Sequence, residues 1–359
     1  MAFNLTDRIG SVKVASLVAS SGSVVSAWEA WPKKEARSGG EVDWAAEFAT
    51  ARRYGVSIVT PADAAYPPRL AEQPAHPLVL YVKGDLSALD APCVAIVGTR
   101  RATAYGLDQA FRFAHDLAER GWTIVSGLAL GIDAEAHRGA LAAGGKTVGV
   151  IGSGLDRFYP EENRELAREI VEKGGAVVSE FPFGRPPDQQ TFPQRNHVVA
   201  ALARGVLAVE SPVKSGTLIT TSLAADMGRV VMALPGRVDS RASGGCLQLL
   251  RDGARLVRCA ADVEEELSSL LPSVSAPRVP KRAGAEKPAG ETSAPPPPAF
   301  TVEEALVMRE VDADGVAMDL LVRRTGLSAE RVSAICMSLR LKGRVRFFPG
   351  NRVALPRGV

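Results

Sequence analysis

The segment VAIVGTRRATAYG, residues 94–106, predicts the fold of this chain. Its run VAIV is typical of a buried strand, Gly98 ends that strand, and LDQAFRFAHDLAERG continues with an amphipathic helical pattern. Six similar runs follow: TIVS (123–126), TVGVI (147–151), AVVSEF (176–181), VLAVES (206–211), VVMALP (230–235) and RLV (255–257). Strands that alternate with helices predict an α/β fold with a doubly wound, mostly parallel sheet covered on both faces.

The turns after these strands are rich in glycine and hydroxyl side chains. In parallel sheets, ligands bind at the carboxyl ends of the strands, where such turns lie side by side. We therefore expect one polar crevice, formed by Gly98-Thr99-Arg100, Ser126-Gly127, Gly152-Ser153-Gly154 and Lys214-Ser215-Gly216-Thr217.

The first of these turns has the features of a phosphate site. Gly98 allows the backbone to approach an anion, the start of the following helix attracts it, and Arg100 can donate two hydrogen bonds to it. Thr103 adds a hydroxyl, and Tyr105 offers a ring on which a base could stack. A tight turn with solvated arginines is the alternative. Neither GxGxxG after this strand nor a Walker A sequence is present.

Two other segments repeat this chemistry. Lys214-Ser215-Gly216-Thr217 again combines a cation, a glycine, hydroxyls and a helix start. Arg195-Asn196, in FPQRNHVVAALARG, adds a polar pair near another helix start, although such a pair could equally be a cap and a structural ion pair.

Catalytic residues are harder to find. Asp133 and His137 are four residues apart on one helix, so an acid–base pair is conceivable, but a structural contact is favoured. The sequence contains no serine nucleophile elbow, no HExxH and no cluster of carboxylates for two metal ions. It therefore predicts a binding protein, not an enzyme, with no catalytic residues, metal or cofactor.

Composition divides the chain into four parts. Residues 272–299 contain eight prolines and no Leu, Ile, Phe, Tyr or Trp, which predicts a linker. Residues 1–60 have a helical pattern, residues 61–271 form the sheet domain, and residues 300–359 predict three helices and a hairpin. Because Ser328 can cap the helix that follows a Thr-Gly-Leu-Ser turn, this tail is predicted to be a winged helix.

Charge and cysteine content are less decisive. The 43 Lys and Arg exceed the 40 Asp and Glu by three, a mildly basic balance. The four cysteines form no CxxC pair, and no stretch approaches 18 apolar residues. We expect a cytoplasmic protein that makes no membrane contact.

Several longer motifs, in this order, resemble one family. They are AYPPRL, LYVKGDL, VAIVGTRRATAYG, SGLALGIDAEAHRGAL, VGVIGSGLDRFYPEEN, FPQRNHVVAALARGVLAVES, KSGTLITTSLAADMGRVVMALPG and LLRDGA. Together they resemble the DNA-processing protein A (DprA/Smf) family over residues 60–257. The N-terminal segment is similar to the sterile-alpha-motif (SAM) or helix-hairpin-helix (HhH) segments of that family, and the tail is similar to its winged helix.

The resemblance implies an extended Rossmann-like fold, usually in a homodimer. It further implies a protein that binds single-stranded DNA, protects incoming strands during natural transformation and loads the RecA recombinase onto them. The family's DNA pocket carries over to Gly98, Thr99, Arg100, Arg195, Asn196, Lys214, Ser215, Gly216 and Thr217. With Thr103, Tyr105, Ser126 and Gly127 from the same turns, these are the predicted DNA-binding residues.

Two positions depart from the family pattern. His197 stands where members commonly have a second arginine, so one phosphate contact is expected to be weaker. The segment DSRASGGCLQLLRDGA (239–254) lacks the asparagine that is usual in the family. This segment includes part of the last predicted helix, and in the family it often contributes to dimerisation.

The sequence also allows two other function classes. Related Rossmann-like enzymes hydrolyse nucleoside monophosphates with a glutamate in a PGGxGTxxE loop, but here the comparable loop reads PVKSGTLITT, with Lys214 and no glutamate. A winged-helix transcription factor is the third class. The tail has ten Lys and Arg against seven Asp and Glu, a modest excess for duplex binding, so a protein contact is equally open.

Overall fold

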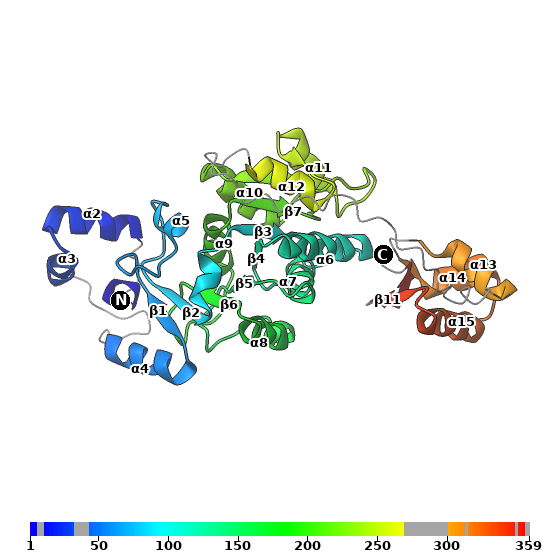
Figure 1. Cartoon of the computed structure of the whole chain (residues 1–359), viewed down its shortest axis with the longest axis horizontal. Coiled ribbons are helices and arrows are strands. Elements are labelled where there is room, and N and C mark those ends of the chain that lie inside the picture. The colour runs from blue at the N-terminus through cyan, green and yellow to red at the C-terminus, as the bar shows by residue number, and fades with distance from the viewer. Residues whose placement is uncertain (6–10, 32–42, 269–300, 313–314, 349–350, 356–359) are drawn as a thin grey trace, which may run out of the picture. The chain divides into compact units, whose positions relative to one another are not determined.

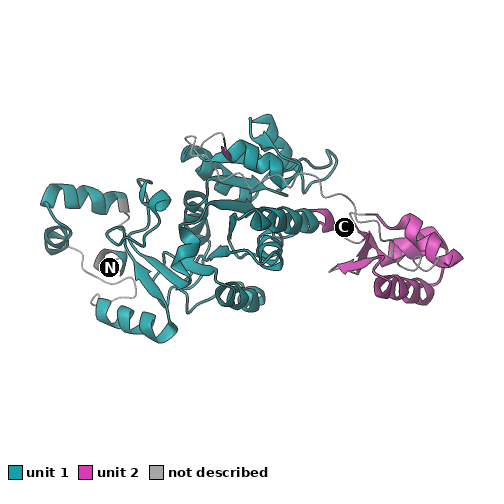
Figure 2. Ribbon diagram, in the orientation of Figure 1, with its two compact units in different colours: residues 1–102, 106–267 teal, residues 103–105, 268–359 magenta. Residues whose placement is uncertain are grey.

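The computed structural model describes residues 1–5, 11–31, 43–268, 301–312, 315–348 and 351–355 (Figure 1). The chain divides into two compact units, one of residues 1–102 and 106–267 and one of residues 103–105 and 268–359 (Figure 2). The predicted linker, residues 272–299, lies outside the described residues. None of the described helices has both the length and the apolar character needed to span a membrane.

The first unit is built on a nine-stranded sheet. Its strands are β1 Ser57–Val59, β2 Leu80–Gly84, β3 Cys93–Val97, β4 Thr123–Ser126, β5 Thr147–Val150, β6 Ala176–Ser179, β7 Gly205–Ala208, β8 Val230–Ala233 and β9 Arg255–Leu256. They lie in the order β1-β2-β6-β5-β4-β3-β7-β8-β9. All seven predicted runs form strands, and these pair in parallel. The predicted α/β class is confirmed, and β1 and β2 add an antiparallel edge.

Helices cover both faces of this sheet (Figure 1). On one face lie α9 (Thr191–Leu202) and α10 (Gly216–Asp226), and on the other α7 (Ile132–Ala142) and α8 (Arg164–Glu172). Strand β6 shows the alternation behind this arrangement, because Val178 packs in the cluster of α9 whereas Val177 packs in that of α8. Helix α6 (Ala104–Glu119) crosses α7 at Gly139, where a Cβ would lie 2.2 Å from the Phe111 carbonyl oxygen.

The strand order reverses between β3 and β7. From β3 the chain proceeds through β4 and β5 to β6, then returns to β7 on the other side of β3 and continues to β8 and β9. At such a reversal the turns after the two neighbouring strands diverge and leave a crevice at their carboxyl ends. Here those turns are residues 98–103, which begin with Gly98, and residues 209–215, which lead into Gly216.

Smaller elements complete the first unit. They are α1 (Ala2–Leu5), α2 (Ser11–Ser21), α3 (Val24–Ala30), α4 (Trp44–Tyr54), α5 (Pro68–Ala71), the 3-10 turns η1 (Leu86–Leu89) and η2 (Glu161–Asn163), α11 (Gly244–Arg251) and α12 (Ala260–Ser268). Helices α2 and α3 pack through Val14, Ala27 and Trp31, a small apolar cluster typical of a helical module. Its identity as a SAM or HhH segment stays a prediction.

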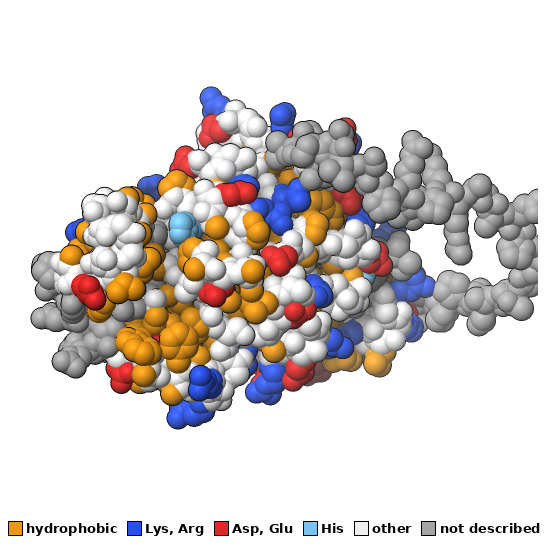
Figure 3. All heavy atoms as spheres, turned by 60° about the vertical axis from the view of Figure 1, so that its left-hand side comes forward, with side chains coloured by type: hydrophobic (Ala, Val, Ile, Leu, Met, Phe, Trp, Pro, Cys, Tyr) orange, Lys and Arg blue, Asp and Glu red, His pale blue; other side chains and the backbone are white. Residues whose placement is uncertain are grey.

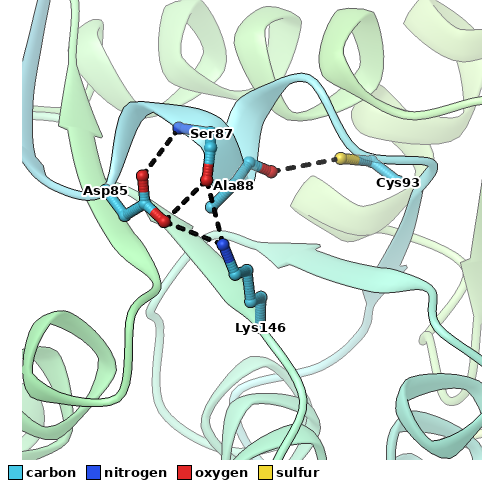
Figure 4. A network of polar contacts seen from close by, with 5 residues as sticks. All are labelled: Asp85, Ser87, Ala88, Cys93 and Lys146. Carbon is cyan, nitrogen blue, oxygen red and sulfur yellow. Dashed lines mark hydrogen bonds and ion pairs between the residues drawn. The ribbon is translucent and has the colours of Figure 1, made fainter.

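A polar network ties η1 to the central sheet (Figure 4). Asp85 caps η1 through the Ser87 amide, and Lys146, directly before β5, donates to Asp85 Oδ2 (2.8 Å) and Ser87 Oγ (2.9 Å). The hydrogen bond from Lys146, followed by those from Ser87, lowers the pKa of Asp85 to about 2. Since both charged side chains are about 40% exposed, the pair contributes only about 0–1 kcal/mol.

The second unit contains the predicted winged helix. Its elements are α13 (Val302–Glu310), β10 (Val316–Ala317), α14 (Met318–Thr325), α15 (Ala329–Leu341), β11 (Arg346–Phe348) and β12 (Arg352–Ala354), with strand order β10-β12-β11. Ser328 caps α15 by accepting a hydrogen bond from the Arg331 amide, as predicted. Buried side chains from all three helices, including Val307, Leu321 and Leu339, form its core.

Candidate nucleic-acid interface

A crevice of about 770 Å³ opens in the first unit, at the carboxyl ends of β3 and β7. Ten of the thirteen predicted DNA-binding residues line it: Gly98, Thr99, Arg100, Gly127, Arg195, Asn196, Lys214, Ser215, Gly216 and Thr217. The structure thus brings together turns that are more than 100 residues apart in the sequence, although their role in binding DNA stays a prediction.

The turn after β3 is held on both sides by backbone contacts. The Thr99 amide donates to the Glu210 carbonyl oxygen (2.8 Å), and the Thr99 carbonyl oxygen accepts from the Ile132 amide (3.3 Å). A Cβ at Gly98 would lie 2.5 Å from Ile132 Cγ1, so glycine is needed here for packing against α7. This fixed turn directs the exposed Arg100 toward the crevice.

The start of α6 differs from the expectation. A Cβ at Gly106, in its first turn, would lie 2.2 Å from Glu210 Oε2, and Glu210 is buried. A carboxylate therefore already lies at the helix start that the sequence assigned to a phosphate. The start of α10 is different, because its N-cap residue Ser215 makes no capping hydrogen bond and Gly216 and Thr217 line the crevice. An anion in the crevice would meet the amides of α10.

Arg195 braces the turn after β4. It is buried, its Nη1 donates to the carbonyl oxygens of Gly127 and Val150, and its Nε donates to Asn196 Oδ1 (3.1 Å). Burial, more than the nearby Arg100, lowers the pKa of Arg195 to about 10, while Asp133 opposes that shift. These contacts indicate that Arg195 and Asn196 mainly hold the turn in place, the structural role given above as the alternative to direct phosphate binding.

Asp133 supports the same turn from the other side. Its Oδ2 accepts hydrogen bonds from the Gly127 amide (3.2 Å) and the Ala129 amide (3.4 Å). Between them, Leu128 has a φ of 52°, a left-handed conformation that is unfavourable for a leucine. Burial raises the pKa of Asp133 and the charge of Arg195 opposes this.

Four exposed cations line the crevice: Arg100, Arg101, Lys214 and Arg241. None of them has a carboxylate within 4.0 Å among the described residues. Among the described residues that line the crevice, Asp133 is the one carboxylate, and it is buried and accepts hydrogen bonds from two backbone amides. In contrast, acidic and basic side chains are interspersed on the face seen in Figure 3. The crevice is therefore locally positive in a chain whose net charge is only +3.

An aromatic platform adjoins these cations. The Arg100 guanidinium lies 5.1 Å from the centroid of the Phe192 ring. The ring centroids of Phe192 and Tyr159 are 5.8 Å apart, and Tyr159 is 46% exposed. With Leu130 and Pro160 they border a small side cavity. Such rings can stack on bases of any sequence. Tyr105 was predicted for this role from the sequence, whereas Phe192, Tyr159, Arg101 and Arg241 were not predicted.

Three predicted residues do not line the crevice. Ser126 is fully buried and its hydroxyl donates to the Ile96 carbonyl oxygen (2.6 Å). Thr103 and Tyr105 lie at the start of α6, outside the described lining. His197 is also absent from the lining, and burial lowers its pKa; the weaker phosphate contact expected from it stays a prediction.

Asp133 and His137 do not form a pair. His137 Nδ1 lies 2.7 Å from Thr147 Oγ1, which itself donates to the Ile124 carbonyl oxygen. Burial lowers the pKa of His137 to about 3, so the ring is neutral and structural. Among the described residues, His115, Asp116 and Glu119 on α6 could share a metal ion, but they lie outside the crevice and nothing else there indicates a ligand.

Comparison with known proteins gives one consistent result. Residues 57–268 match the family model of DNA recombination-mediator protein A, and residues 291–351 match that of the DprA winged helix domain. Protein Smf of Synechocystis sp. is 35% identical over 82% of this chain and 79% of its own length. Protein Smf of Escherichia coli is 36% identical over 83% and 77%.

Two solved structures are similar as well. DNA processing protein A of Streptococcus pneumoniae has a TM-score of 0.57 and 40% identity, over 61% of this chain and 77% of that chain. DNA processing protein A of Helicobacter pylori, whose structure concerns its single-stranded DNA binding mode, has a TM-score of 0.54 and 31% identity, over 60% and 97%.

Proposed function

Because the chain belongs to the DNA recombination-mediator protein A family and is thus a DNA-processing recombination mediator, we propose that it binds single-stranded DNA in the crevice between the β3 and β7 turns. The observation that carries this proposal is the set of four crevice cations that have no acidic partner in the described part of the chain. A polyanion that follows the crevice would supply the missing negative charge.

The geometry suggests how a strand would be held. One backbone phosphate would lie at the start of α10, near Lys214 and the Gly216 and Thr217 amides. Neighbouring phosphates would meet Arg100 and Arg241, and a base would stack on Phe192 and Tyr159. None of these contacts reads a base edge, so we expect little sequence preference and a strong dependence of affinity on salt.

Binding without catalysis is the function we propose for this crevice. The alternative, hydrolysis of nucleoside monophosphates, needs a carboxylate close to the substrate. Among the described residues that line the crevice, Asp133 is the single carboxylate, and it is buried and accepts two amide hydrogen bonds. Burial and the two amide hydrogen bonds to its Oδ2 give Asp133 the features of a structural carboxylate that supports the Gly127–Ala129 turn.

Fluorescence anisotropy of a labelled dT oligonucleotide tests the proposal. Arg100→Ala combined with Lys214→Ala should weaken binding at least tenfold, about 1.4 kcal/mol, and reduce the slope of log K against log salt by about 1.4. Lys173→Ala combined with Arg251→Ala removes two exposed cations outside the crevice and is the control. Equal affinity of the crevice variant and the control would contradict the site.

The finer role follows from the family. We propose that the chain acts in the cytoplasm as a homodimer, protects incoming strands during natural transformation, and loads a RecA-type recombinase onto them. A strand-exchange assay with strands already covered by single-strand-binding protein tests the loading. If added protein fails to accelerate RecA while it still binds dT, loading is excluded and DNA binding stands.

A further inference from the structure

Three arginines, Arg69, Arg204 and Arg229, lie close together at the amino ends of β7 and β8, on the opposite side of the sheet domain from the crevice. Arg204 directly precedes β7 and Arg229 directly precedes β8, and the parallel register pairs Gly205 with Val230. The two arginines therefore lie side by side at the amino ends of adjacent strands. Arg229 Nη2 donates to the carbonyl oxygen of Arg69 (3.2 Å), which brings α5 to the same place.

Their neighbours supply little negative charge. Arg69 Nη2 donates to the Ala91 carbonyl oxygen (2.9 Å), and Arg229 Nη2 donates to that of Ala201 (3.3 Å). The carboxylate nearest to the cluster is that of Glu72, which lies 3.7 Å from Arg229 and is 63% exposed. Arg69 and Arg204 have no carboxylate within 4.0 Å among the described residues. Like charges directly opposite each other on paired strands are destabilising.

Two donors of this cluster also lack acceptors. The Nε atoms of Arg204 and Arg229 are buried and have no hydrogen-bond partner among the described residues. Burial, and then the charge of Arg69, lowers the pKa of Arg204. Burial also lowers the pKa of Arg229; Glu72 opposes this shift, and the charges of Arg69 and Arg204 add to it. Carbonyl contacts explain one nitrogen each of Arg69 and Arg229, but they leave the Arg204 guanidinium unexplained.

We propose that Arg69, Arg204 and Arg229 form a second anion site that binds a phosphate group. A phosphate offers several acceptor oxygens to the planar guanidinium groups and neutralises charges that now repel one another. The phosphate could come from the backbone of a bound strand or from a free phosphate compound. The site itself does not depend on the crevice, and only its assignment to a DNA strand rests on the proposed function.

Thermal unfolding of the full chain in inorganic phosphate, with ionic strength held constant by chloride, tests the site. Arg100→Ala combined with Lys214→Ala serves as the background, so that the crevice does not contribute. At phosphate about five times its Kd, the Tm of this background should rise by about 2–4 °C. Adding Arg204→Met should abolish the rise, and Arg204→Lys should retain part of it. Arg251→Met in the same background should leave it unchanged.

The effect of Arg204→Met on the Tm in phosphate-free buffer distinguishes an anion site from a structural role of Arg204. Because Arg204→Met relieves repulsion, it should leave the Tm in phosphate-free buffer unchanged or raise it. Since its side chain has no described hydrogen bond, the variant should fold, and Arg204→Gln serves as a second variant. A fall in Tm without phosphate, or a phosphate response that persists without Arg204, would overturn the proposal.

Oligonucleotide binding then identifies the source of the phosphate. If a strand reaches the cluster, Arg204→Met should reduce the salt slope by about 0.7 for a long dT oligonucleotide and leave a short one unaffected. Unchanged binding of both, with the phosphate response lost, assigns the site to a free phosphate compound. A failure of the proposed function looks different, because the crevice variant would then bind dT as well as the unaltered chain.

Discussion

His137 shows how a single buried residue makes stability depend on pH. Its folded pKa of about 3 lies below its usual value of about 6.5, so the folded chain binds fewer protons between these values. Stability should therefore fall as the pH drops from about 6.5 toward 3, by about 2–3 kcal/mol between pH 7 and 4.5. Urea unfolding across this range measures the loss.

His137→Gln should flatten that dependence, because it removes the titrating ring and keeps a hydrogen-bonding group near Thr147. His115→Gln, at a half-buried position on α6, is the matched control and should retain the full dependence. If the slope survives in His137→Gln, another group causes it.

Single residues also mark where sequence reasoning succeeded and where it could not. Gly98, Arg100 and Lys214 were found because they lie in turns that follow strands, and the carboxyl ends of parallel strands lie on the same side of the sheet. Arg241 lies in a turn well after β8 and Phe192 in the first turn of α9, so only tertiary packing brings them to the crevice. Tyr105 was assigned to it because nothing local revealed that Glu210 lies at the start of α6.

At the scale of elements, strands β3 to β7 were predictable because each is a short apolar run that is buried along its whole length. Strand β8 is half buried and β9 is exposed, and their runs VVMALP and RLV were found from the repeated alternation of strands and helices. Strand β1 has three residues, only one of them buried, and β2 ends in an exposed Lys83 and Gly84. Neither run is long or apolar enough to predict a strand from the sequence. The winged helix was predictable from its caps and turns, since Ser328 and Gly326 mark helix ends locally.

Helix α10 allows DNA affinity to be separated from stability. A Cβ at Gly216 would meet no described atom within 4 Å, and its φ is ordinary, so Gly216→Ala fits the free protein. It should stabilise the helix by about 0.4–1 kcal/mol. The same methyl would obstruct a phosphate at the helix start, and dT affinity should fall at least about fivefold, about 1 kcal/mol.

Ser222→Ala, at an exposed position further along α10, is the control. It should also favour the helix slightly, and it should leave dT affinity unchanged. Thermal unfolding and anisotropy on the same samples give both quantities. A Gly216→Ala variant that is more stable and binds dT normally would place the phosphate elsewhere in the crevice.

At the scale of the whole molecule, positive charge lies at both ends of the parallel strands. The crevice cations lie at the carboxyl ends, and Arg69, Arg204 and Arg229 lie at the amino ends. A single DNA strand bound at both sites would have to pass around the first unit. Oligonucleotide length would then change affinity in steps, which a single crevice would not produce.

The proposed homodimer needs a surface, and the described strands offer one at β9. This edge strand pairs with β8 alone in the described sheet, and its Leu256 is 51% exposed beside Arg255. An open edge with an apolar side chain favours pairing with a second copy about a two-fold axis. Leu256→Glu would place two like charges in that interface. We therefore expect sedimentation to show a dimer for the unaltered chain and a monomer for Leu256→Glu.

The substitution should not disturb the crevice, since Leu256 does not line it. Binding of a short dT oligonucleotide should thus remain within about twofold of normal, about 0.4 kcal/mol. Lys173→Glu, at the exposed C-cap of α8, introduces the same acidic side chain on a helix that packs on β5 and β6 rather than near β9, and is the control. If Leu256→Glu remains dimeric, the contact lies on another surface; if it becomes monomeric and loses short-strand binding as well, the crevice is complete only in the dimer.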